Sequence, residues 1–121
     1  MAACLAALSA GGCQKAAPVA PAPTSATPAV TVTISRTGLD PRSVTIALGD
    51  RVLFVNNDAT AHSIGSNPHP DHTDCPGINQ VGFLSPGQRR ETGNFVAVRS
   101  CGFHDHDEPF DQDYWGTIVT R

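Results

Sequence analysis

The stretch VTIALGDRVLFVNND, residues 44–58, decides the fold expected for this chain. Over residues 44–48 apolar side chains alternate with smaller or polar ones, which is the pattern of a half-buried β-strand. Gly49 and Asp50 are turn residues. The continuous apolar run at residues 52–55 is typical of a strand that is buried on both sides. The stretch therefore predicts two short strands joined by a tight turn.

The same period of two recurs on both sides of this stretch. Valine and isoleucine alternate with threonine and serine over residues 30–35, a strand pattern surrounds residues 91–98, and another closes the chain at 115–120. Turn residues separate these runs, for example at 38–41 and 86–87. No stretch combines helical periodicity with capping residues. Several short strands at this spacing predict an all-β, Greek-key β-sandwich.

Length and charge set limits on organisation and partners. The chain has 121 residues, which suffices for one compact domain and not for two. Its net charge is −3 and it contains no basic run, so nucleic acid is not an expected partner.

The first thirty residues differ in composition from the rest. Residues 1–13 are a short apolar segment that ends in small residues and Cys13, and they resemble the lipobox of a bacterial lipoprotein, in which the cysteine is acylated. Residues 14–29 are rich in proline and alanine, which is typical of an extended tether. We therefore expect a signal-like segment, a disordered linker and a folded domain over residues 30–121, held outside the cytoplasm by a lipid on Cys13.

The histidines are confined to one part of the chain. All five lie between positions 62 and 106, and two of the four cysteines lie in the same region. Imidazole and thiolate are ligands that copper and zinc favour. Because the loops of a sandwich gather at its ends, we expect the segments around positions 62 and 104 to meet at one tip and form a metal site. The residues concerned are His62, His69, His72, Cys75, Cys101, His104 and His106.

The motifs of this region resemble those of the plastocyanin-like cupredoxins. In that family a Gly-Asp-x-Val-x-Phe-x-Asn strand, present here within residues 44–58, leads to the first copper-ligating histidine, which corresponds to His62. Residues 101–104, Cys-Gly-Phe-His, resemble the family's Cys-x-x-His ligand pair, and residues 116–119 resemble its closing strand. The resemblance spans about residues 30–121 and implies a cupredoxin-like β-sandwich that holds copper as Cu(II) or Cu(I).

The chain also departs from this family pattern. Blue-copper sites usually carry a weak axial methionine, whereas the only methionine here is Met1 and Tyr114 stands where the ligand would be. The insertion at residues 67–72 and the His-Asp-His run at 104–106 resemble a branch of bacterial cupredoxin-like proteins more than plastocyanin itself.

Two roles remain open for Cys101. As a thiolate it would complete a trigonal copper site with His62 and His104. As the partner of Cys75 it would instead form a disulfide, which an oxidising compartment favours. In that case the metal would rest on imidazoles alone, namely His62, His104 and His106, with His69 or His72 as a further ligand.

The functional hypothesis is a copper-binding envelope protein rather than an enzyme. A single mononuclear site without an evident base or second metal gives little support to catalysis. We expect an extracytoplasmic, periplasmic carrier that passes electrons or the ion itself to a redox or copper-handling envelope partner. It would contact the membrane only through its lipid anchor. The alternative is a metal-free cupredoxin-like domain used for structure or protein contacts.

Overall fold

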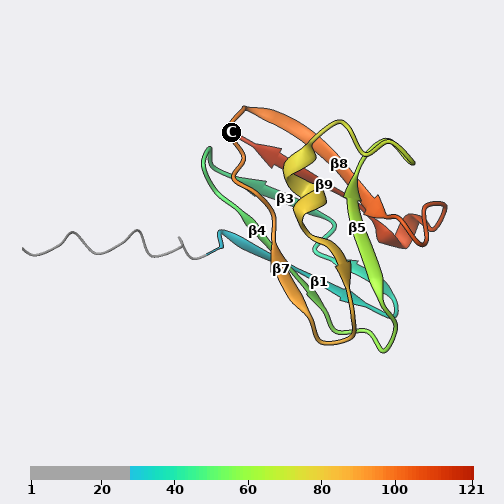
Figure 1. Ribbon diagram of the computed structural model, residues 1–121. Coiled ribbons are helices and arrows are strands. Elements are labelled where there is room, and N and C mark those ends of the chain that lie inside the picture. Colours follow the sequence, from blue (N-terminus) through green and yellow to red (C-terminus); the bar gives the residue numbers. More distant parts are fainter. Residues whose placement is uncertain (1–27) are drawn as a thin grey trace, which may run out of the picture.

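The computed structural model describes residues 28–121, which form a sandwich of two β-sheets (Figure 1). The signal-like segment with Cys13, and all of the tether before residue 28, lie outside the described residues. One sheet has the strand order β2-β1-β4-β7 and the other the order β3-β9-β8-β5-β6. The prediction of an all-β sandwich is confirmed.

The strands are short and include two parallel pairs, β1 with β4 and β3 with β9. Within residues 28–121 the structure has no helix long and apolar enough to cross a bilayer, and its helical turns are the 3₁₀ segments η1 (Pro76–Gln80) and η2 (Gln112–Tyr114). The strands are β1 (Val30–Ser35), β2 (Gly38–Asp40), β3 (Ser43–Ile46), β4 (Val52–Asn56), β5 (His62–Ser66), β6 (Gly82–Leu84), β7 (Arg89–Glu91), β8 (Arg99–Asp105) and β9 (Trp115–Thr120).

The core lies between the two sheets. Phe54 of β4 meets Phe103 of β8 edge to face, with 5.2 Å between the ring centroids, and both side chains are fully buried. The prediction that residues 52–55 are buried on both sides is wrong: Leu53 and Val55 are only half-buried. In a two-layer sandwich each sheet is covered on one face, so even an all-apolar strand buries alternate side chains.

The strand expected around residues 91–98 is also placed differently. β7 ends at Glu91 and the next strand begins at Arg99. Between them the backbone of Phe95 bonds with the turn after β3, at Gly49 and Asp50, instead of continuing a ladder. The apolar pattern of this segment therefore belongs to a loop at one end of the sandwich.

Cys75 and Cys101 form a disulfide, with 6.0 Å between their Cα atoms. Cys75 directly precedes η1, and Cys101 lies on β8 with its side chain in the core. Of the two roles left open for Cys101, the disulfide is therefore the one present in the structure. The hypothesis that Cys101 is a thiolate ligand is wrong, because its Sγ is bonded to the Sγ of Cys75 and carries no thiolate charge.

His62 lies inside the sandwich between two carboxylates. Its side chain is buried, with Nδ1 2.5 Å from Asp105 Oδ2 and Nε2 2.9 Å from Asp58 Oδ2. The ring of Tyr114 packs against it at a centroid distance of 4.9 Å. Burial alone would lower the pKa of His62, but the hydrogen bonds to Asp105 and Asp58, together with the negative charges of these carboxylates, raise it. The hydrogen bond to His62 likewise lowers the pKa of Asp58.

This network predicts a specific pH dependence of stability. Because the folded pKa of His62 is raised above the ordinary value of 6.5, its contribution is complete below that pH and is lost as the pH rises through the folded pKa. We expect the His62 ring to titrate above its ordinary pKa in an NMR titration. We also expect urea unfolding to show a lower free energy at about pH 9 than at about pH 6. A ring that titrates below the ordinary value would contradict the ion network.

Candidate metal centre

The pairing of β5 with β8 separates His62 from His104. Ile64 lies opposite Asp105, and Gly65 lies opposite His104. Asp105 bonds to His62 in the interior, and neighbouring residues of a strand point to opposite faces, so His104 points to the outer face of the sheet. The expectation that His62 and His104 share one site is therefore wrong: their strands are neighbours, but their side chains lie on opposite sides of the sheet.

The loop between β5 and η1 brings two other histidines to His104. His69, His72 and His104 each offer one ring nitrogen, and these atoms lie within 4.8 Å of one another. The ring centroid of His104 is 5.4 Å from that of His69 and 4.9 Å from that of His72. This group on the outer face of the five-stranded sheet is the candidate metal centre.

Hydrogen bonds fix the orientation of two of the three rings. His72 Nδ1 donates to the carbonyl oxygen of Ser66 at 2.7 Å, and His104 Nδ1 donates to Oδ1 of Asn67, also at 2.7 Å. Both acceptors are carbonyl oxygens, so the proton of each neutral ring is on Nδ1 and the lone pair is on Nε2. A donated Nδ1 proton is the usual support of a metal-ligating histidine.

His104 Nε2 is buried and has no hydrogen-bond partner among the residues that the structure describes. The residue is 4 % exposed. Burial, followed by the charges of His72, His69 and His106, holds the pKa of His104 below its ordinary value. A buried polar atom normally has a partner, and a neutral imidazole with a free lone pair is the form that ligates a metal. The group therefore fits a divalent metal ion.

His106 extends this group at its exposed edge. Its Nδ1 lies 2.7 Å from His72 Nε2, and because that atom carries the lone pair of His72, His106 is the donor. Its ring centroid is 4.9 Å from those of His69 and His72. His106 is thus a fourth imidazole beside the three, although it is not one of the group of three ring nitrogens. A metal ion on His72 Nε2 would have to replace this hydrogen bond. That His106 itself is a ligand stays a prediction.

Two glycines leave room for the loop on the sheet surface. A Cβ at Gly65 would lie 2.5 Å from His72 Nδ1, and one at Gly102 would overlap the amide of Asn67. Gly65 lies on β5, directly across the ladder from His104, and Gly102 lies on β8, two residues before His104. The loop that carries His69 and His72 can lie on the sheet only because these side chains are missing.

Sequence reasoning missed the residues that support the centre. Asn67 and Ser66 orient two rings, and neither belongs to a recognised ligand motif. The available signal was the Asn-Pro-His-Pro-Asp-His run at residues 67–72, in which a polar side chain directly follows a strand and precedes two histidines.

No family profile and no curated protein matches this sequence. Solved structures, by contrast, are similar to this chain. The purple cupredoxin of Nitrosopumilus maritimus is 18 % identical, with 76 % of this chain and 99 % of that chain covered and a TM-score of 0.60.

Two further solved structures give similar values. Plastocyanin from Dryopteris crassirhizoma is 16 % identical over 75 % of this chain and 99 % of its own, with a TM-score of 0.59. The Cu(I) form of an amicyanin mutant is 18 % identical over 79 % of this chain and 85 % of its own, with a TM-score of 0.63. The described residues therefore have the cupredoxin fold, as the sequence motifs indicated.

Proposed function

We propose that this chain is a copper-binding carrier protein that holds the ion on His69, His72 and His104. The observation that carries the proposal is the buried, unpartnered Nε2 of His104, which lies in a group of three ring nitrogens. Copper is the metal of choice because the similar structures include an amicyanin in its Cu(I) form, and because Cu(II) binds most tightly to nitrogen ligands among the divalent first-row metals.

The ligand set favours holding and passing on the ion over fast electron transfer. Blue-copper electron-transfer sites depend on a cysteine thiolate, and here Cys101 is bonded to Cys75. An all-imidazole group suits Cu(II) capture instead. His69 and His106 are exposed, so the centre is open to solvent and to a partner protein on one side.

The cellular setting remains part of the proposal. The disulfide is typical of an oxidising compartment, which agrees with an extracytoplasmic, lipid-anchored protein whose Cys13 is acylated. We propose a copper-handling envelope protein as the partner. A direct membrane contact beyond the lipid anchor is not part of this proposal.

A metal-free interaction domain is the second candidate. It is favoured by His62, the residue that corresponds to the family's first copper ligand, because both of its ring nitrogens already bond to carboxylates. Under this hypothesis the fold would be retained for protein contacts alone. Copper titration of the oxidised protein separates the two candidates.

Replacement of a histidine inside or outside the centre tests the assignment. We expect His104→Gln to weaken Cu(II) binding by about tenfold or more, because it removes the buried ligand nitrogen Nε2, which has no hydrogen-bond partner within residues 28–121 to give up when the metal binds. His62→Gln, the matched control inside the sandwich, should leave the affinity unchanged. Competition against a chelator of known affinity measures both, with circular dichroism as a check of folding. The opposite ranking of the two variants would place copper at His62 and contradict the proposal.

The space above Gly65 gives a second test. Gly65→Ala places a methyl group against the His72 ring and should displace it, so we expect Cu(II) affinity to fall severalfold. Gly77→Ala is the control, since its nearest atom would be 3.9 Å away, an ordinary contact. Isothermal titration of both variants checks this, and equal affinities would show that His72 does not ligate.

A further inference from the structure

The disulfide anchors the loop that carries His69 and His72 to the core near the loop's C-terminal end. Within residues 67–77 the only buried residue is Cys75, and His69 and His72 lie in this same segment. Cys75 is bonded to Cys101, which lies on β8 three residues before His104. A single covalent bond therefore joins the loop with two candidate ligands to the strand with the third.

The other attachments of this loop include hydrogen bonds, some of which are buried or part-buried. Asn67 N donates to the Gly102 carbonyl at 3.0 Å, and Cys75 N donates to Ser66 Oγ at 3.3 Å. Asn79 Nδ2 donates to the carbonyl oxygen of His72. Each such bond adds only a modest net stability, so these bonds hold the loop less firmly than a covalent bond to the core does. Between the buried Ser66 and the buried Ile78 the disulfide is the one covalent link of this segment to β8.

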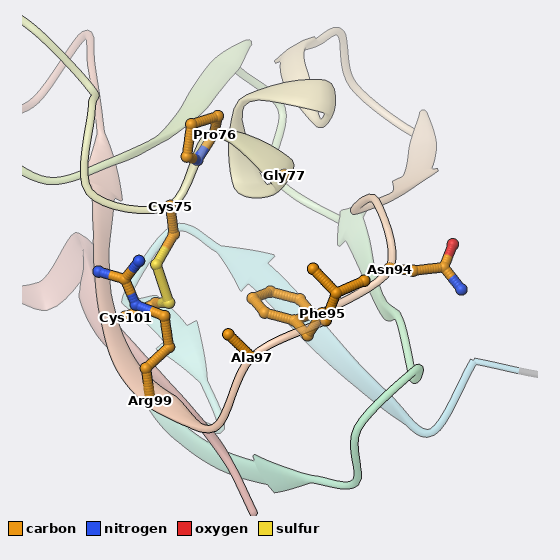
Figure 2. Close-up of a pocket in the computed structure, with 9 residues that line it drawn as sticks. Cys75, Pro76, Gly77, Asn94, Phe95, Ala97, Arg99 and Cys101 are labelled. Atoms are coloured by element: carbon orange, nitrogen blue, oxygen red, sulfur yellow. A yellow bond between two sulfur atoms is a disulfide. The ribbon is translucent and has the colours of Figure 1, made fainter.

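A cavity of about 140 Å³ lies against the two sulfurs (Figure 2). Both cysteines line it together with Phe95, Ala97 and Arg99 (Figure 2). Arg99 is exposed, and its positive charge favours the approach of a thiolate and stabilises a cysteine thiolate formed nearby. The cavity thus gives a reducing thiol a route to a disulfide whose cysteines are otherwise buried.

We propose that Cys75–Cys101 is a redox-active disulfide, that a protein dithiol reduces it through this cavity, and that reduction frees the histidine loop and weakens the metal centre. The last part rests on the proposed function, whereas the thiol–disulfide exchange does not. The disulfide thereby sets whether the centre keeps or releases its ion.

The exchange is balanced within the two partners. A thiolate of the dithiol attacks one sulfur, the Cys75–Cys101 bond breaks, and a mixed disulfide forms while the other cysteine leaves as a thiolate and takes up a proton. The second thiol of the partner then attacks the mixed disulfide. The products are two cysteine thiols in this chain and one disulfide in the partner, so two electrons and two protons reach this chain.

The exchange is tested first on the metal-free full chain with dithiothreitol. Thiols that are free before reduction are blocked with one alkylating reagent, and new thiols are labelled with a heavier one and counted by mass. We expect two new labels while the circular dichroism of the sheets stays native, and slower labelling in Arg99→Gln but not in the control Arg89→Gln. Labels that appear only after denaturant is added would overturn the proposal.

The link to the metal is tested by Cu(II) competition titration of the oxidised chain and of C75A/C101A. We expect about tenfold weaker binding by the variant, because its ligands are no longer held together. Equal affinities would overturn the link. If neither protein binds copper, the proposed function fails, and the exchange experiment stands independently.

A measurement on the unaltered chain covers the case in which the variant does not fold. A metal ion bound to His69, His72 and His104 would hold the loop against β8, so the loop would open less often and the sulfurs would be less accessible to a reductant. We expect Zn(II)-loaded chain to lose its disulfide to a phosphine reductant, which does not reduce Zn(II), severalfold more slowly than metal-free chain. Equal rates would contradict the proposed link.

Discussion

The alternation of side chains along β8 determines how this chain uses its histidines and cysteines. Cys101, Phe103 and Asp105 point into the sandwich, where they meet Cys75, Phe54 and His62 respectively, while Gly102 and His104 point outward. One strand thus supplies a disulfide, a core contact and an ion pair on its inner face and a candidate ligand on its outer face. Because the period of a strand is two, none of these roles can be exchanged with a neighbour without shifting the whole register.

The outer face becomes a candidate metal centre through the loop that lies on it. Gly65 and Gly102 make room for the loop, Asn67 and Ser66 orient the rings, and the disulfide holds the loop to the strand. Each of these features is local, and together they position the group, since two of its candidate ligands, His69 and His72, come from a segment with few buried residues. The cupredoxin sandwich serves as a rigid support for a group of imidazoles that lies outside its interior.

Much of the fold was predictable, because strands that bury one face leave a period-two pattern, as at residues 30–35 and 115–120. Residues 92–98 carry an apolar pattern too, but hydrogen bonds from Phe95 to a distant turn decide their conformation. The site was only partly predictable. The clustering of histidines indicated a metal centre, whereas the face on which each one lies depends on the register between β5 and β8. Neither segment alone determines such a non-local pairing, and the prediction that His62 and His104 share one site is therefore wrong.

In the proposed centre, three imidazoles on the outer face bind copper and no thiolate takes part. Visible absorption and electron paramagnetic resonance of the oxidised chain with one equivalent of Cu(II) test it most directly. We expect one bound ion, hyperfine coupling to imidazole nitrogens and only a faint d–d band. An intense thiolate-to-copper band, or a spectrum of unbound copper, would contradict it.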